Sequence, residues 1–514
     1  MFSKVKSCAV HGVDGRMIDV EADVNDGLPV FTMVGYLSSS VRESSERVRT
    51  ALKNSGFHLP PKRITINLSP ADMRKDGSGY DLAIATAVLL SLGVTAELPM
   101  EQTLVLGELS LDGSIKAIPG VLPMVICARE EGMTSCIVPK ENVQEAALVQ
   151  GISVIGVSSL KETMEYIQGI KEYENTNVEQ PAVDTSEYLY DIDFSDVVGQ
   201  ESIKRGMEIA AAGFHNVLLT GAAGAGKSML AKRLPTILPQ MSFEESLEVT
   251  KIYSVGGMLP PEGGLIHRRP FRAPHHTISE YALIGGGRVP TPGEVSFAHY
   301  GVLFLDELPE FSKPVLEVLR QPLEERRIRI SRVQASYEFP ADFMFVAAMN
   351  PCPCGNYPDY RRCSCTEQQI RRYQSKVSGP LLDRIDIRME VKGVKQEVLF
   401  SKQKTESSKT IRARVEQARQ MQKDRFAGTG LLFNSQLDGK NLEEYITLSE
   451  EGKRLVLQLF EEQELSVRGV HRVLKLARTI ADLAGSEEIE NAHLQEAAFY
   501  RNQDVFAKEV LYGN

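Results

Sequence analysis

The chain has 514 residues, of which 42% are hydrophobic and 25% are charged, and its net charge is −10. This size predicts two to four domains with sizeable hydrophobic cores. The acidic balance argues against a protein that coats nucleic acid over its whole surface, but it is compatible with a local basic channel. The chain begins without a long apolar run, and no stretch approaches the ~20 apolar residues of a membrane helix. We therefore expect a cytoplasmic protein with no membrane partner and with reduced cysteines.

Strand-like and helix-like runs alternate before residue 171. "GVDGRMIDVEADV" predicts a hairpin that turns at Asp14-Gly15. "RITINL" and "TLVLGELSL" predict strands, and "YDLAIATAVLLSLG" predicts a buried helix that ends at Gly93. Residues 171–190 are polar and lack sustained periodicity, which predicts a linker.

The stretch "NVLLTGAAGAGKSML" is typical of a phosphate-binding loop between a strand and a helix. Glycines let backbone N–H groups curl around phosphates, a lysine neutralises their charge and a serine hydroxyl can hold Mg²⁺. A chance glycine-rich turn is the alternative, and the order of strand, loop and helix argues against it. The residues that would bind nucleotide here are Gly221, Gly224, Gly226, Lys227 and Ser228.

Two later strands end in polar residues that suit the same chemistry. "GVLFLDEL" predicts a buried strand followed by Asp306, which would hold Mg²⁺ together with Ser228, and by Glu307, which would polarise the attacking water. The alternative is a strand that ends in acidic residues by chance. "DFMFVAAMN" predicts a strand ending in Asn350, whose neutral amide can orient water beside a γ-phosphate.

Four of the seven cysteines follow Asn350 closely, in the pattern C-x-C, eight residues, C-x-C. Four thiolates could complete the tetrahedral coordination of Zn²⁺, and the intervening prolines and glycine predict a loop that a bound metal would hold together. The alternative is a reduced cluster facing solvent. Thr366 and Gln369 then read as a capping box that opens the helix "EQQIRRYQSKV". The proposed zinc ligands are Cys352, Cys354, Cys363 and Cys365.

Three arginines are candidates for contact with a γ-phosphate. "SGPLLDRIDI" places Arg384 just before an apolar run, where at a subunit edge it could stabilise a neighbour's transition state. Beyond residue 395 the pattern is helical, and "LSVRGVHRVLKLARTIADLAG" places Val467, Val470, Leu474, Ala477 and Ala481 on one stripe. Arg468 and Arg472 lie four apart on that helix, where one could sense nucleotide. A solvated surface charge is the default for any single arginine.

These motifs, in this order, resemble those of the AAA+ ATPases. "RAPHHTISEYALIGGG" and "PGEVSFAHYGVLFLDELPEF" resemble the magnesium-chelatase-like branch, and with the N-terminal region the chain is similar to the YifB/ComM family over nearly its whole length. The resemblance implies ATP and Mg²⁺ as ligands and a homo-oligomer, in that family a hexameric ring. It assigns Lys227 and Ser228 to Walker A, Asp306 and Glu307 to Walker B, Asn350 to sensor 1, Arg384 to the arginine finger, and Arg468, with Arg472 as second choice, to sensor 2.

The N-terminal stretches "RKDGSGYDLAIATAVL" and "LGELSLDGSIKAIPGVLPMVICAREEGMTSCIVPKEN" resemble the protease domain of Lon. Lon-type proteases use a serine and a lysine, and Gly79 and Leu122 stand where these would be. Ser78 is one position off, and a serine without a base is a poor nucleophile. We therefore expect a Lon-like scaffold without peptidase activity.

The predicted fold class is α/β. We expect a Lon-protease-like α+β domain over 1–170, the linker, an AAA+ P-loop NTPase core over 191–392 and a helical lid over 393–514.

Three functions compete for this architecture. Similarity to ComM implies a ring ATPase that moves single-stranded or branched DNA, a branch-migration helicase in recombination or transformation. The sequence adds "RRIRISRVQASYEFP", which reads as a hairpin of the kind that projects into a ring channel, and two basic stretches, 320–332 and 361–376. Solvated charge or subunit contacts explain those stretches equally well. The second function is a motor that remodels a protein partner, as magnesium chelatase subunits do, and the third, an ATP-dependent protease, is disfavoured by the missing dyad.

Overall fold

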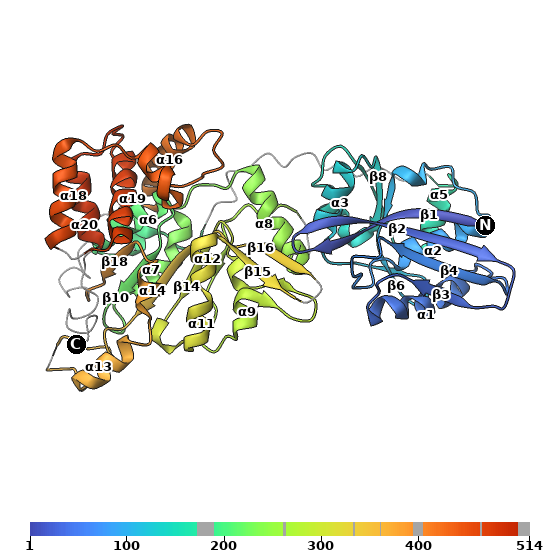
Figure 1. The fold of residues 1–514 in the computed structure, drawn as a ribbon, viewed down its shortest axis with the longest axis horizontal. Coiled ribbons are helices and arrows are strands. Elements are labelled where there is room, and N and C mark those ends of the chain that lie inside the picture. The colour runs from blue at the N-terminus through green and yellow to red at the C-terminus, as the bar shows by residue number, and fades with distance from the viewer. Residues whose placement is uncertain are drawn as a thin grey trace.

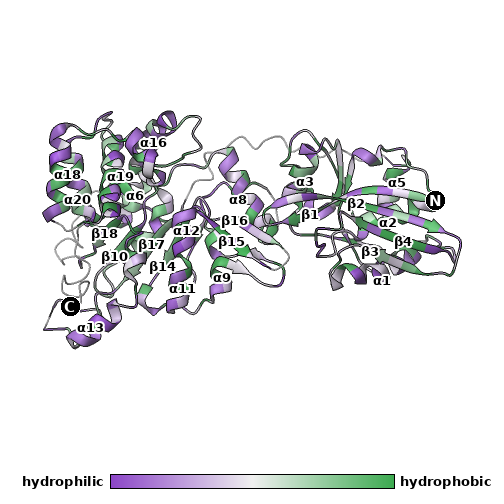
Figure 2. Cartoon of the chain, in the orientation of Figure 1, coloured by the Kyte–Doolittle hydropathy of each residue, from purple (hydrophilic) through white to green (hydrophobic). Residues whose placement is uncertain are grey.

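The computed structural model describes residues 1–171, 190–260, 264–332, 335–359, 361–393, 405–462 and 465–501. Apart from its two end residues, the expected linker at 171–190 lies outside these ranges. The described parts form a row, with a mixed sheet at the N-terminal end, a parallel sheet in the middle and a group of helices at the other end (Figure 1). Hydrophobic residues concentrate on the buried strands of both sheets and hydrophilic ones on the outer helices (Figure 2).

The N-terminal sheet has seven strands in the order β3-β4-β2-β1-β5-β8-β9. Helices α1, α2 and α5 contribute to the core on one face, and α3 and α4 to the core on the other. The long strand β2 alternates buried and partly exposed residues, as a strand with two different faces should. The elements are β1 (Phe2–His11), β2 (Asp14–Asn25), β3 (Phe31–Val34), α1 (Ser39–Asn54), β4 (Arg63–Ser69), α2 (Asp81–Ser91), β5 (Thr103–Val105), β6 (Glu108–Leu109), β7 (Ile115–Lys116), α3 (Val121–Glu130), β8 (Ser135–Pro139), α4 (Val143–Ala146), β9 (Ser153–Val157) and α5 (Leu160–Ile167).

Two details of this region differ from the sequence prediction. The β1–β2 hairpin turns at Gly12-Val13 and not at Asp14-Gly15, because Asp14 already pairs with His11 and Gly12 takes the left-handed φ of +68° that the turn requires. The run "TLVLGELSL" forms two short strands, β5 and β6, instead of one. The helix prediction is confirmed, with α2 ending two residues before Gly93.

The central sheet has five strands, all parallel, in the order β11-β14-β17-β10-β18. β10, β14 and β17 are buried throughout, which explains their continuous apolar sequences. The chain order reverses around β10, so a crevice forms at the carboxyl ends of the strands, where ligands bind in sheets of this kind. The strands are β10 (Val217–Thr220), β11 (Phe271–Arg272), β14 (Val302–Leu305), β17 (Met344–Met349) and β18 (Ile387–Glu390).

Helices cover both faces of this sheet, and two hairpins extend from it. The predicted hairpin in "RRIRISRVQASYEFP" is present as β15 and β16. The helices are α6 (Glu201–Gly213), α7 (Lys227–Arg233), α8 (Phe243–Val255), α9 (Glu280–Ile284), α10 (Glu294–Phe297), α11 (Lys313–Val318), α12 (Arg320–Glu325), α13 (Glu367–Gln374) and α14 (Gly379–Leu382), and the hairpin strands are β12 (Gly285–Gly286), β13 (Thr291–Pro292), β15 (Arg327–Ser331) and β16 (Ser336–Pro340).

The described residues between 405 and 501 are mainly helical, as predicted for this part of the chain. Its helices are α16 (Ser408–Arg425), α17 (Gly439–Tyr445), α18 (Glu450–Glu462), α19 (Val467–Leu483) and α20 (Asn491–Arg501). On α19 the predicted apolar stripe packs inward from Val470 onward, but Val467 is 64% exposed because it occupies the first turn of the helix. Among the helices in the described ranges, none has both the length and the apolar character needed to span a membrane.

The turn of the first hairpin connects the N-terminal sheet to the central part. Val13 packs with Ile252 of α8, Phe297 and Phe339 of β16 in a small buried cluster. Beside it the His11 ring stacks on Tyr337, with ring centroids 4.5 Å apart. The N-terminal sheet therefore contacts the β15–β16 hairpin directly through packed side chains.

Candidate active site

The phosphate-binding loop joins the end of β10 to the start of α7, as the sequence predicts. Gly224 and Gly226 take φ of +77° and +94°, a left-handed conformation that favours glycine. At Gly221 a Cβ atom would lie 2.2 Å from the Val391 carbonyl oxygen, so no side chain fits there. Each of the three glycines therefore has its own backbone reason to be glycine.

Lys227 and Asn350 meet at the base of this loop. The Lys227 ammonium donates to the carbonyl oxygens of Gly221 and Ala222 at 2.7 and 2.9 Å, and to Asn350 Oδ1 at 3.0 Å. Burial lowers the pKa of Lys227, and the carboxylates of Asp306 and Glu307 oppose that shift. The lysine is thus held where it can exchange these oxygens for those of a phosphate, next to the predicted sensor amide.

Ser228 and Asp306 form the second pair of the site. The Ser228 hydroxyl donates to Asp306 Oδ2 at 2.5 Å, so two oxygens of the kind that Mg²⁺ prefers converge on one point. These two residues would hold the ion, which would neutralise phosphate charge when bound. Glu307 is exposed, and it has a left-handed φ of +52°, a conformation that non-glycine residues adopt mostly under local constraint.

Arg384 lies outside this group of contacts. It is 5% exposed, and its guanidinium pairs with Glu324 and donates to the Pro380 carbonyl at 2.5 Å. None of its polar contacts within the described ranges reaches Lys227 or Asp306. Hydrogen bonding from Arg384, with the charge of Arg468 contributing, lowers the pKa of Glu324. The predicted finger thus has Glu324 as its partner in the single chain.

Arg472, the second choice for sensor 2, has a structural partner. It pairs with the buried carboxylate of Asp386, which also lies 3.5 Å from His215 Nδ1. Burial opposes ionisation of Asp386, but Arg472 beside it holds its pKa well below the usual range. Arg468 is exposed on the first turn of α19. The geometry favours Arg468 over Arg472 as the residue free to meet a ligand.

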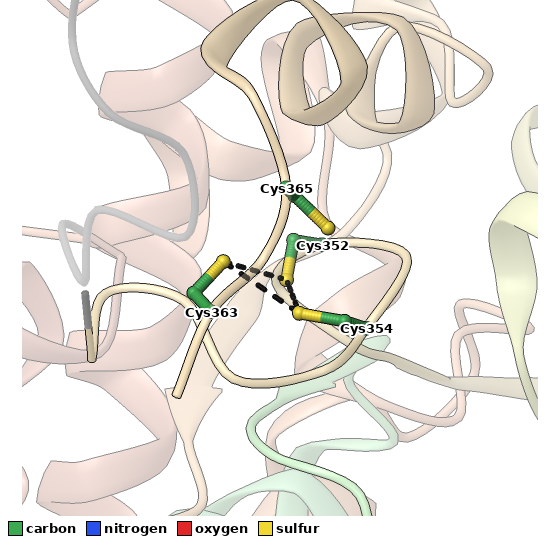
Figure 3. A group of neighbouring side chains, drawn as sticks. All are labelled: Cys352, Cys354, Cys363 and Cys365. Carbon is green, nitrogen blue, oxygen red and sulfur yellow. Dashed lines mark hydrogen bonds between the residues drawn. The ribbon is translucent and has the colours of Figure 1, made fainter. Parts of the chain in front are cut away.

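The four clustered cysteines converge in the loop between β17 and α13, with their side chains pointing toward one another (Figure 3). Their sulfur atoms all lie within 4.8 Å of one another, and three of the pairs are 3.4, 3.8 and 3.6 Å apart. A zinc ion with Zn–S bonds of 2.3 Å requires sulfurs about 3.8 Å apart in a tetrahedron. The donor set and its spacing thus fit zinc. The predicted capping box of Thr366 and Gln369 is confirmed at the start of α13.

The N-terminal sheet contains no serine–lysine pair at the positions expected for Lon. Leu122 is fully buried in α3, and a Cβ on Gly79 would lie 3.1 Å from the Ile118 side chain. The Ser78 hydroxyl hydrogen-bonds to Glu108, a carboxylate that cannot take the place of the missing lysine. These positions therefore do not bring a serine and a lysine together in the way that the Lon resemblance would require.

Sequence reasoning missed two residues that shape the site. Glu324, the partner of Arg384, lies sixty positions before it and looks like any acid on a surface helix. Gln374 of α13 donates to the Pro351 carbonyl at 2.8 Å and ties the helix to the start of the cysteine loop. Neither residue carries a local signal, because each acts through a partner that only the fold brings near.

Three family models match the chain. The model described as "Magnesium chelatase, subunit ChlI" matches residues 193–399, "Subunit ChlI of Mg-chelatase" matches 20–142, and "Magnesium chelatase, subunit ChlI C-terminal" matches 405–501. The chain is 40% identical over 503 residues to the competence protein ComM of Haemophilus influenzae, which covers 97% of each chain. It is 41% identical over 506 residues to the uncharacterized protein YifB of Escherichia coli, covering 98% of this chain and 97% of the other. This chain belongs to the YifB/ComM family.

The nucleotide site is thus that of a YifB/ComM protein, a magnesium-chelatase-like AAA+ ATPase. A partial match supports the Lon resemblance as well. Lon protease 2 of Bacillus subtilis is 30% identical over 183 residues, which is 32% of each chain.

Proposed function

We propose that the chain is an ATP-hydrolysing motor whose site is completed by a neighbouring copy. The observation that carries ATP hydrolysis is the convergence of Lys227 with Asn350 and of Ser228 with Asp306 at the end of the parallel sheet. Lys227 would bind the β- and γ-phosphates, Ser228 and Asp306 would hold Mg²⁺, Glu307 would activate water and Asn350 would orient it. An ATPase assay with the parent chain tests the proposal, and absence of Mg²⁺-dependent turnover would reject it.

The proposal of a ring of identical copies rests on the position of Arg384. Because its partner in the single chain is Glu324 and its polar contacts lie away from the nucleotide site, it would meet a γ-phosphate in a second copy, and Arg468, exposed on α19, would sense nucleotide. We infer a homo-oligomer, most simply a hexameric ring. The proposed division into 1–170, 171–190, 191–392 and 393–514 is supported by two separate sheets followed by a helical end.

We propose DNA as the substrate of this motor. The name of the relative ComM, a competence protein, supports DNA. The basic stretch at 320–332 supports it less than expected, because Arg327 and Arg329 both pair with Glu338 across the hairpin, at 3.1 and 2.9 Å. Arg332 is different, since it is exposed and donates to the Gly287 carbonyl without an acidic partner among the described residues.

Arg332 lines two adjacent hollows that form a basic groove. A hollow of about 450 Å³ lies between the N-terminal sheet and the β15–β16 hairpin, and one of about 730 Å³ lies beside the β12–β13 turn. Tyr337 lines the first hollow, and Tyr281, 69% exposed, lines the second. Two acids, Asp72 and Glu131, share the wall. Arginines interleaved with aromatic rings suit the phosphates and bases of a single strand. The groove's arginines are Arg16, Arg74, Arg288 and Arg332.

Replacing Arg16 and Arg332 together with alanine should weaken binding of single-stranded DNA and lower the magnitude of the slope of log affinity against log salt by about 1.4. Basal ATPase activity should stay at the parental level, because neither residue touches the nucleotide site. Binding of a labelled oligonucleotide by anisotropy at several salt concentrations measures the effect.

Arg63→Ala is the matched control for this variant. Arg63 is an exposed arginine that pairs in register with Asn25, at the opposite end of β2 from Arg16. It should leave DNA binding unchanged. The parent is tested with single-stranded, duplex and four-way-junction DNA. If it binds none of them and none of them changes its ATPase activity, the motor acts on a protein partner instead.

We propose a structural zinc ion in the cysteine cluster. The purified chain should contain about one zinc per copy, because four thiolates at this spacing occupy all four coordination positions of a tetrahedral zinc ion. Replacing Cys352 and Cys363 with serine should remove it, whereas Cys127→Ser, at a cysteine of the N-terminal part, should not. Elemental analysis gives the result, and a native chain that carries no zinc would contradict the proposal.

A further inference from the structure

The cysteine loop lies directly against the phosphate-binding loop. A Cβ built on Gly355 would be 3.3 Å from the Ala223 backbone nitrogen and 3.8 Å from Asn350 Cγ. Ala223 belongs to the loop whose N–H groups would surround phosphates, and Asn350 is the predicted sensor. The middle of the cysteine loop is therefore a wall of the nucleotide site.

The cysteines themselves determine how this wall is held. Gly355 follows Cys354 immediately, and its N–H donates to the Cys352 carbonyl at 3.0 Å in a tight turn. The Tyr357 N–H points at Cys352 Sγ from 3.4 Å, an arrangement that steadies a metal-bound thiolate. None of the described residues between β17 and α13 belongs to a helix or a strand. Its position against Ala223 thus depends on what joins the four sulfur atoms.

We propose that metal bound by the four cysteines presses this loop against the phosphate-binding loop and so sets the affinity for ATP. Binding the ion fixes Cys352 and Cys354, the first and third residues of the turn, which keeps Gly355 in contact with Ala223. Without the ion the turn loses its tie to the second pair, Cys363 and Cys365, and the backbone that binds phosphate loses its support. The inference rests on the zinc proposal above.

Removal of the metal tests this coupling. Zinc is stripped with a zinc-selective chelator in the presence of excess Mg²⁺, and the affinity for a fluorescent ATP analogue is measured before stripping, after stripping and after zinc is returned. Losing a single hydrogen bond to a charged phosphate costs about tenfold or more in affinity, so we expect affinity to fall by about tenfold or more and to recover with zinc. Far-ultraviolet circular dichroism checks that the stripped chain stays folded.

A glycine pair tests the contact without touching the metal. Gly355 and Gly428 have the same φ of +79°, but a Cβ on Gly428 meets nothing within 4 Å. Alanine at either position must adopt the same unfavourable φ. Only Gly355→Ala places its Cβ atom against Ala223. We expect Gly355→Ala to weaken ATP binding while zinc content stays the same, and Gly428→Ala to bind ATP like the parent.

The outcomes separate the two proposals. A native chain without zinc overturns both. A chain that holds zinc, binds ATP equally well when stripped, and tolerates Gly355→Ala as well as Gly428→Ala keeps the zinc site but overturns the coupling. Loss of affinity in both experiments, with the control unchanged, supports it.

Discussion

Glu307→Gln should bind ATP as tightly as the parent and hydrolyse it about 10²- to 10⁴-fold more slowly, the usual cost of losing a general base. The amide keeps the size of the side chain and removes only the oxygen charge that polarises water. The Lys227–Asn350 and Ser228–Asp306 hydrogen bonds do not involve Glu307, so binding should survive. Equilibrium binding of a labelled nucleotide and steady-state phosphate release measure the two quantities separately.

The control is Glu310→Gln, the same change three residues later. Glu310 is an exposed acid whose partner is Lys376 at 3.4 Å, outside the nucleotide contacts. It should turn over at the parental rate. Parental turnover by Glu307→Gln itself would mean that another residue activates the water.

Arg384→Ala should also retain ATP binding, and its turnover should fall by about 10³-fold or more, as when an arginine finger is removed. In the single chain this arginine is buried against Glu324, and in the proposed ring it would act on the nucleotide of another copy. Arg320→Ala is the control, because Arg320 also lies near Glu324 but has its own partner, Glu317, at 2.8 Å. It should keep most of the activity.

Mixing the two inactive variants distinguishes action between copies from action within one. In a mixed ring, some interfaces place an intact Arg384 beside an intact Glu307, so part of the ATPase activity should return. Mixing is verified by mass photometry or by resonance energy transfer between labelled copies. If the copies mix and no activity returns, Arg384 serves its own chain.

The nucleotide site could be predicted from sequence because each of its parts is local. The glycines, Lys227 and Ser228 follow one another directly, and Asp306 and Asn350 each end an apolar strand. Parallel strands bring such ends to one edge, so the meeting of Lys227 with Asn350 follows from the fold class alone. The capping box at Thr366 needs only four residues, and it too was predictable.

What could not be predicted depends on contacts between distant segments. The Glu324–Arg384 pair and the approach of Gly355 to Ala223 leave no pattern in either partner's neighbourhood. The hairpin turn was misplaced by two residues because Asp-Gly is a strong turn signal, whereas the fold uses Gly12-Val13 so that Val13 can enter the cluster with Phe339. Tertiary packing overrode local preference there.

That buried turn has a mechanical consequence. Strands β1 and β2 pair from Phe2↔Asp23 to His11↔Asp14, a ribbon about 30 Å long at about 3.3 Å per residue. One end is anchored in the cluster against β16, and the ribbon itself forms the middle of the seven-stranded sheet. A shift of the β15–β16 hairpin would therefore rotate the whole N-terminal sheet about this anchored end. A small displacement at the hairpin would then become a larger displacement at Phe2, at the far end of the ribbon.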